Sequence, residues 1–234
     1  MPARAAQTAS YYFTPKNGNV AIGSLAIRDD NIPGDGLVTH IHMSLTGVEG
    51  PPFQEICLFP HVKEWDMKVC NLNGTLPDWV PSCLPVIEEY DLSRNQLTGT
   101  IPAAYGIFNR MNQFKMQGNK LTGTLPPEMS NLTKLEWFRV FDNQLEGTIP
   151  PSYSRLNPRL TQVSIGGNKF SGNLYTLATA QLQSTNITYL PSMCGMVPAG
   201  FLFANGFDLA GSPGLGLPCP EEVQHGWPEP VDDF

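Results

Sequence analysis

The sequence has little charge, and little of that charge is positive. Fourteen Lys and Arg residues stand against 21 Asp and Glu residues in a chain of 234, which gives a net charge of −7. Nucleic acids and anionic membrane surfaces both bind clustered cations, so this balance argues against either as a partner. No run of apolar residues approaches the length of about 18 that a membrane span needs, so no transmembrane helix is predicted.

The sequence also lacks the motifs of common catalytic and cofactor sites. It contains no GxSxG, P-loop, HExxH or dinucleotide-binding pattern, so no cofactor is predicted. No CxxC pair or His/Cys cluster has the spacing of a structural zinc site. The first ten residues lack the apolar centre of a secretory signal. Two interpretations stay open, namely an intracellular protein or a sequence that begins after its signal.

Glycine and proline are the residues in excess. The chain has 22 of each, or 44 of 234 residues, against a usual share of about 12% for the pair. Both residues break helix interiors, so this excess excludes a helical bundle. The excess is periodic, because glycines recur every 24 or 25 residues at Gly50, Gly74, Gly99, Gly123, Gly147 and Gly172. A fixed period of this length is typical of a solenoid.

Each repeat carries the pattern of a short strand followed by a polar residue that turns inward. Nine and seven residues before each glycine stand apolar residues, such as Phe114 and Met116, which alternate with polar ones and predict a half-buried strand. Each repeat buries only one face, so its stability must come from stacking on its neighbours. Four residues before the glycine, we expect side chains that satisfy backbone groups and form a ladder, at Cys70, Asn95, Asn119, Asn143 and Asn168.

The repeat resembles the plant-type leucine-rich repeat, whose pattern is LxxLxLxxNxLxGxIPxx. Residues 91–102 (DLSRNQLTGTIP) and 142–150 (DNQLEGTIP) carry the match, which covers about residues 37–177 in about six repeats. The organisation is similar to that of polygalacturonase-inhibitor proteins and receptor-like kinase ectodomains. The resemblance implies an α/β-type solenoid, namely a right-handed superhelix with a parallel concave sheet of about six to eight strands and a convex side of 3₁₀ and irregular turns.

The two ends of the chain depart from the repeat. Residues 1–36 are expected to form a non-repeat segment or cap, although they contain neither the cysteines nor the tryptophan of the family's N-terminal cap. Residues 178–234 are expected to hold a degenerate last repeat, a C-terminal cap and an acidic tail.

The five cysteines leave at least one outside any intrachain disulfide. Residues 194–219 resemble the cysteine-stapled cap that closes such ectodomains, which implies a disulfide between Cys194 and Cys219. Cys57 and Cys83 lie about one coil apart, and the spacing of about 4.8 Å between adjacent coils is compatible with a second disulfide. Cys70 would then remain as a buried residue.

Three Asn-x-Thr sequons make Asn73, Asn131 and Asn186 candidate glycosylation sites in a secreted chain. Asn73 belongs to the repeat pattern itself, so its sequon can arise by chance. Asn131 is favoured, because we expect it on the convex connection, where a glycan would not obstruct the sheet.

The outward-facing residues of the expected strands predict a partner-binding surface on the concave face. Trp137 and Phe141 flank Arg139, and large aromatics and arginine are enriched at binding hot spots. The alternative is that a terminal segment folds over these side chains and covers them. The full set of candidate contact residues is Glu64, Asp66, Glu89, Asp91, Lys115, Trp137, Arg139 and Phe141.

Two other uses of this face are less favoured. His40 and His42 point the same way beside Glu64 and Asp66 and could bind a divalent metal, but a salt-bridged polar face is the more ordinary interpretation and no metal is predicted. Carboxylates on neighbouring strands could form a general acid/base pair. A shallow curved sheet does not exclude water from a substrate, so no enzyme activity is predicted.

The resemblance and the cysteine cap together favour a non-catalytic interaction module. We expect it to be secreted or to face the cell surface and to bind a protein partner, with a glycan as another candidate. The alternatives are a structural subunit of a larger membrane or extracellular assembly and an inhibitor of a secreted cell-wall hydrolase.

Overall fold

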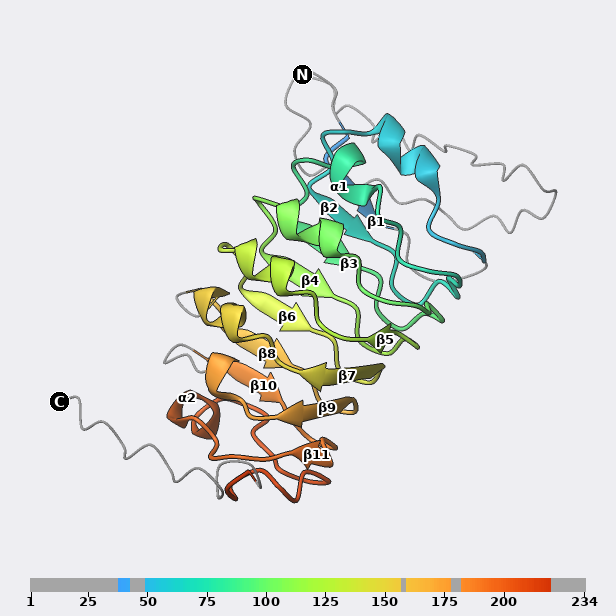
Figure 1. The fold of residues 1–234 in the computed structure, drawn as a ribbon. Coiled ribbons are helices and arrows are strands. Elements are labelled where there is room, and N and C mark those ends of the chain that lie inside the picture. Colours follow the sequence, from blue (N-terminus) through green and yellow to red (C-terminus); the bar gives the residue numbers. More distant parts are fainter. Residues whose placement is uncertain (1–37, 43–48, 157–158, 178–181, 220–234) are drawn as a thin grey trace, which may run out of the picture.

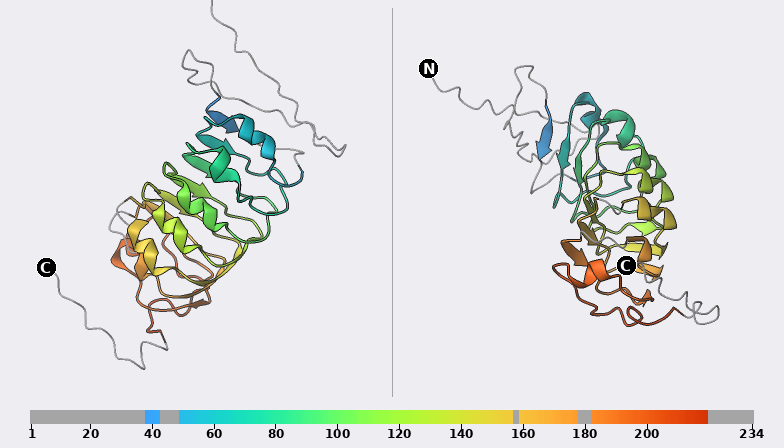
Figure 2. Two further views of the ribbon diagram at one scale, coloured as in Figure 1. Left: turned by 45° about the horizontal axis from the view of Figure 1, so that its top comes forward. Right: turned by 90° about the vertical axis from the view of Figure 1, so that its left-hand side faces the viewer.

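The protein is a curved stack of coils. The computed structural model describes residues 38–42, 49–156, 159–177 and 182–219 (Figure 1). Strands line one side of the stack and short helical turns line the other (Figure 2). The expected N-terminal segment 1–36 and the acidic tail after residue 219 lie outside the described residues.

The inner side is a parallel sheet with one strand from each coil. Its register places His40, Glu64, Glu89, Gln113, Trp137, Gln162 and Ser184 in line, which is the register that the glycine alignment predicts for the six repeats. In sheet order the strands are β1 (His40–His42), β2 (Glu64–Asp66), β3 (Glu89–Asp91), β4 (Gln113–Lys115), β6 (Trp137–Arg139), β8 (Gln162–Ser164) and β10 (Ser184–Asn186).

A second, smaller parallel sheet of four strands follows the bend of the later coils. Its strands are β5 (Thr122–Gly123), β7 (Gln144–Thr148), β9 (Lys169–Gly172) and β11 (Ser192–Met193). The outer side carries short helical turns, which are η1 (Gln54–Leu58), α1 (Val80–Cys83), η2 (Ala103–Ile107), η3 (Pro127–Asn131), η4 (Pro151–Leu156), η5 (Tyr175–Leu177) and α2 (Ala199–Leu202). None of the described helices is long and apolar enough to cross a membrane.

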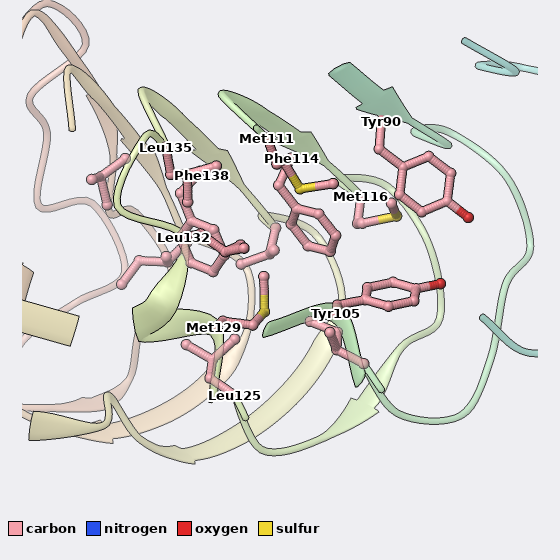
Figure 3. Close-up of a cluster of buried hydrophobic side chains, with 14 of the residues drawn as sticks. Tyr90, Tyr105, Met111, Phe114, Met116, Leu125, Met129, Leu132, Leu135 and Phe138 are labelled. Carbon is pink, nitrogen blue, oxygen red and sulfur yellow. The ribbon is translucent and has the colours of Figure 1, made fainter. Parts of the chain in front are cut away.

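The core lies between the inner sheet and the outer turns. The middle residue of each strand points into it, so rings from successive coils stack (Figure 3). The ring centroids of Trp65 and Tyr90 are 5.2 Å apart, and those of Phe114 and Phe138 are 6.1 Å apart. All four side chains are fully buried. At about 1.5–3 kcal/mol for each large apolar side chain, this column is a main source of the fold's stability.

An asparagine ladder joins the coils behind the inner sheet. The Asn119 amide donates to the carbonyl oxygens of Leu92 and Met116, each at 3.0 Å, while its Oδ1 accepts the backbone N–H of Leu97 at 3.0 Å. Asn95, Asn143 and Asn168 make equivalent bonds in their own coils. Cys70 occupies the same position one coil earlier, where it is buried and its backbone N–H donates to Asn95 Oδ1 at 3.0 Å.

The repeat glycine is required by both backbone and packing. Gly123 has φ +76°, in the left-handed region that favours glycine. A Cβ at this position would lie 2.8 Å from the Thr100 methyl of the preceding coil. Any other residue would therefore strain the backbone and force the Thr100 side chain or its surroundings to shift.

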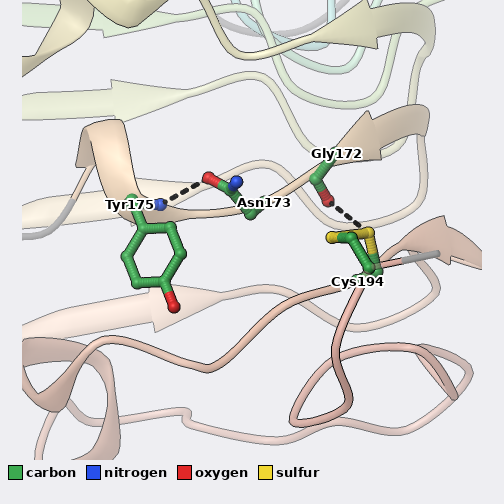
Figure 4. The surroundings of a disulfide bond; sticks show 5 residues. Gly172, Asn173, Tyr175 and Cys194 are labelled. Carbon is green, nitrogen blue, oxygen red and sulfur yellow. Dashed lines mark hydrogen bonds between the residues drawn. A yellow bond between two sulfur atoms is a disulfide. The ribbon is translucent and has the colours of Figure 1, made fainter. Parts of the chain in front are cut away.

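Two disulfides tie neighbouring coils together, and both expected pairings are confirmed. Cys57 and Cys83 join η1 to α1, with 4.7 Å between their Cα atoms. Cys194 and Cys219 close the last coils, with 5.0 Å between their Cα atoms. Figure 4 shows this second disulfide beside the carbonyl of Gly172, which lies 3.6 Å from Cys194 Sγ.

Candidate binding face

The concave face consists of the side chains that flank the buried middle residue of each inner strand. Successive side chains of a strand point to opposite faces, so the first and third residues of each strand share one surface. The residue two positions after each strand extends that surface by one more row. The sheet register places all eight predicted contact residues on β2, β3, β4, β6 and the segment after β6.

At the N-terminal end of this face, histidines and carboxylates form a polar network. The Nε2 atoms of His40 and His42 lie 3.3 and 3.4 Å from the two Glu64 oxygens, and His42 Nδ1 lies 3.6 Å from Asp66 Oδ2. Asp66 also accepts a 2.6 Å bond from the Lys68 ammonium. This bond is the main reason why the pKa of Lys68 is raised. The described part of the chain contains no group of three or more His, Cys, Asp or Glu side chains arranged to hold a metal ion.

The centre of the face is a chain of contacts that crosses four strands. Lys115 Nζ lies 2.6 Å from Glu89 Oε1 and 4.7 Å from the centroid of the Trp137 ring. The guanidinium of Arg139 lies 4.7 Å from the same ring and bonds to Gln162 Oε1, with its Nε at 3.1 Å. The half-buried Trp137 ring therefore contacts two cations, and each cation–π contact contributes about 0.5–2 kcal/mol.

Two buried aspartates lie side by side next to this chain. Asp66 and Asp91 are in register on β2 and β3 and are only 6% and 5% exposed. Asp91 Oδ1 accepts the Ser93 backbone N–H at 2.9 Å. Burial raises the pKa of Asp91, and the negative charge of Asp66 raises it further, whereas the hydrogen bonds from Ser93 and the charge of Lys115 oppose the shift.

The floor of β4 holds two residues that the sequence did not single out for partner contact. The Oε1 atoms of Gln113 and Gln117 are buried and accept no hydrogen bond from the described residues. Gln117 is only 9% exposed. The repeat alignment places both glutamines in the outward-facing rows, but it cannot show that their Oε1 atoms accept no hydrogen bond.

Phe141 contributes less to the central cluster than its sequence position suggests. It is half-buried and lies two residues after Arg139. In the described part of the chain, its ring makes no aromatic or cation–π contact with Trp137 or Arg139. The structure therefore brings together Lys115, Trp137 and Arg139, with Phe141 at the edge of the group.

The three sequons lie in different surroundings. Asn73 is exposed just before the bend at Gly74, and Asn131 is exposed at the end of η3 on the outer side. Asn186 is half-buried in β10, and its Oδ1 accepts the Thr188 hydroxyl at 3.0 Å and the Thr188 backbone N–H at 3.3 Å. The third sequon therefore lies on the inner sheet rather than in a connection.

A separate hollow of about 380 Å³ lies where the chain enters β3, β4, β6 and β8. Its walls are entirely charged or amide side chains, from Glu88, Arg110, Asn112, Lys134, Glu136 and Arg159. Small-molecule sites are usually enclosed and mostly apolar. The polar walls of this hollow therefore do not resemble those of a small-molecule site.

No protein-family model matches the sequence, and no curated protein matches it. Several solved structures do. The TDR receptor is 27% identical with a TM-score of 0.65, and the match covers 70% of this chain and 28% of that one. The leucine-rich-repeat ectodomain of the plant membrane receptor kinase GASSHO1/SCHENGEN3 from Arabidopsis thaliana is 24% identical with a TM-score of 0.60, over 68% of this chain and 19% of that one.

A third structure is closer in length. Pollen receptor kinase 3 is 22% identical with a TM-score of 0.64, over 70% of this chain and 79% of that one. This chain therefore spans less than a third of the first two structures and most of the third. The repeat sequence, the stacked parallel strands and these matches agree. The chain is a plant-type leucine-rich-repeat protein.

Proposed function

We propose that the protein is a non-catalytic interaction module that binds a protein or peptide through its concave face. The observation that carries the proposal is the half-buried Trp137, whose ring contacts the cations of both Lys115 and Arg139. Tryptophan and arginine are the residues most enriched at binding hot spots, and a ring that is already fixed loses little side-chain entropy on binding.

The form of the face favours a macromolecular partner. The candidate contacts are spread along parallel strands rather than gathered around an enclosed cavity. A surface of this kind can contact an extended chain at several points, but it does not surround a small substrate or exclude water from it. This supports binding without catalysis.

The similar structures support a protein or peptide as the kind of partner. The TDR protein is named as a receptor, and the GASSHO1/SCHENGEN3 ectodomain was solved in complex with CASPARIAN STRIP INTEGRITY FACTOR 2. This chain covers only part of either protein, so we carry over binding by the solenoid and not the activity of a whole receptor. The structural-subunit and hydrolase-inhibitor alternatives stay predictions.

We also propose an extracellular or secretory-pathway location. The support is the pair of disulfides, Cys57–Cys83 and Cys194–Cys219. Disulfides form and persist in oxidising compartments and are rare in the cytosol.

The test uses peptides selected against the full chain from a displayed random library, called the selected peptides below. Their affinity is measured by calorimetry for the parent chain, for the double variant Trp137→Ala/Arg139→Ala, and for a control double variant on the outer side, Ile107→Ala/Arg155→Ala. Both control residues are exposed on η2 and η4. We expect a loss of about tenfold or more for the concave variant alone. Equal affinity for all three proteins contradicts the proposal.

A further inference from the structure

The floor between β3 and β4 holds hydrogen-bond acceptors for which the described residues supply too few donors. Asp91 is 5% exposed and accepts the Ser93 backbone N–H, but no described cation forms an ion pair with it. Gln117 lies two residues after Lys115, which is in register with Asp91. It is 9% exposed, and its Oε1 has no hydrogen-bond partner among the described residues. The Oε1 of Gln113 is also buried and accepts no hydrogen bond from the described residues.

The two lysines whose charges act on Asp91, Lys115 and Lys68, form their hydrogen bonds with other carboxylates. Lys115 is in register with Asp91, yet its ammonium bonds to Glu89 at 2.6 Å and lies over the Trp137 ring. On the other side, Lys68 bonds to Asp66 at 2.6 Å. Both charges act on Asp91 from a distance, but neither donates a hydrogen bond to it.

Such an arrangement is unfavourable in the protein alone. The buried Asp91 carboxylate keeps only its hydrogen bonds from Ser93 and has no ion-pair partner among the described residues, and the buried amide oxygens of Gln113 and Gln117 accept no hydrogen bond from them. These groups have therefore lost more hydration than the fold replaces. A stable core would be expected to replace these groups or to pair them. Asp91 and Gln117 belong to the outward-facing rows of the inner sheet, so a rotation of the Gln117 side chain would turn its buried Oε1 toward an incoming donor.

We propose that this floor binds an arginine side chain of the partner, with the Asp91 carboxylate as its counter-ion and Gln117 Oε1 as a second acceptor. Arginine fits best because its guanidinium presents five N–H donors in a planar fork and can bond to several acceptors at once. Asp66, in register beside Asp91, adds negative charge to the same floor. The inference rests on the proposed function, because it names the partner chemistry of the same face.

A purely structural role for these residues makes a different prediction. If Asp91 served the fold, its replacement by Asn would destabilise the protein. If it is kept for binding, Asp91→Asn removes an unpaired buried charge while an amide oxygen can still accept the Ser93 N–H, so the protein should be at least as stable as the parent. Gln117→Met should behave in the same way, because it replaces an unsatisfied amide with an apolar side chain of similar length.

The experiment compares each selected peptide with a copy in which arginine is replaced by citrulline, which has nearly the same shape but no charge. Affinities are measured for the parent chain, Asp91→Asn, Gln117→Met and the control Asp78→Asn, which changes an exposed aspartate away from the concave face. Thermal unfolding of each variant is recorded alongside. The parent and Asp78→Asn should prefer arginine to citrulline by about tenfold or more, whereas Asp91→Asn should lose that preference and Gln117→Met should weaken it.

The outcomes separate this inference from the proposed function. If the selected peptides lose affinity for Trp137→Ala/Arg139→Ala but bind Asp91→Asn as tightly as the parent, the concave face binds and the arginine assignment is wrong. If they require lysine or no cation at all, the assignment is also wrong. If neither concave variant changes affinity, the proposed function itself has failed. A destabilised Asp91→Asn that retains the arginine preference shows a structural role and overturns the inference.

Discussion

The ammonium of Lys115 lies 4.7 Å from the centre of the Trp137 ring while it bonds to Glu89 at 2.6 Å. One lysine therefore links a carboxylate on β3 to an aromatic ring on β6. The side chains of Lys115 and Glu89 are only 10% and 19% exposed, so water screens the pair weakly. The Trp137 ring thus contacts a cation that is itself paired with a carboxylate on β3.

Replacing Lys115 should be costly for both stability and binding. Lys115→Met leaves Glu89 without its partner beside Asp91 and removes one cation from the Trp137 ring, so we expect a loss of about 2 kcal/mol in unfolding free energy. Urea denaturation measures this loss. The control is Lys120→Met, which removes an exposed lysine bonded to Gln96 and should change stability by about 0.5 kcal/mol or less. Equal midpoints for both variants would contradict the role given to Lys115.

The asparagine ladder should carry a measurable share of the stability. Asn119→Ala removes the acceptor for Leu97 N–H and the donor for the Leu92 and Met116 carbonyls. Because buried unsatisfied backbone groups cost about 1–3 kcal/mol each, we expect a loss of about 2 kcal/mol or more. The matched variant Asn109→Ala alters an exposed asparagine and should unfold at nearly the parental urea concentration. An Asn119→Ala variant that unfolds at the parental urea concentration would show that the ladder does not stabilise the fold.

The buried Asp91 should give the stability a distinct pH dependence. Its pKa in the folded protein is raised above the ordinary value of 3.8, chiefly by burial, so the folded state binds this proton more tightly than the unfolded state. Its contribution to stability therefore falls as the pH rises from about 3.8 through the folded pKa, and the penalty stays constant above that value. Asp91→Asn should be more stable than the parent at neutral pH, and this advantage should vanish below about pH 3.8. Thermal melts from pH 3 to 8 measure the difference, and an advantage that persists unchanged in acid would contradict the assignment.

If the chain passes through the secretory pathway, glycosylation should follow the exposure of the sequons. Asn131 is exposed on the outer side, so Asn131→Gln should remove one glycan mass without lowering the melting temperature. Asn186 is half-buried, bonded to Thr188 and packed against Gly166, so we expect it to carry no glycan in the folded protein. Intact-mass spectrometry of secreted parent, Asn131→Gln and Asn186→Gln distinguishes the sites. A glycan at Asn186 would contradict the assignment of this residue to the inner sheet.

The repeat could be predicted from the sequence because its physical requirements recur in every coil. Gly123 must have positive φ and leave room for the Thr100 methyl, and the same need recurs one coil further on at Gly147. Aligning such glycines sets the register of the strands, so that Glu89, Gln113 and Trp137 fall in line. The disulfide partners followed from coil spacing for one pair and from family resemblance for the other.

The contacts within the concave face could not be predicted in the same way. Periodicity sets which Cα atoms are neighbours, but side-chain rotamers decide which groups meet. Lys115 is in register with Asp91 and yet bonds to Glu89, and this choice leaves Asp91 without an ion-pair partner among the described residues. The missing donor at Gln117 is likewise a property of the packed structure and has no sequence signature.

The most direct test of a concave binding face is a map of where a selected peptide contacts the protein. Isotope-labelled full chain is titrated with the peptide, and backbone amide shifts are followed by NMR. Binding through this face should shift the amides of residues 89–93, 113–117 and 137–141, which lie on neighbouring coils of the inner sheet. Shifts confined to the outer turns η2, η3 and η4, or to the second sheet β5, β7 and β9, would contradict the proposed function.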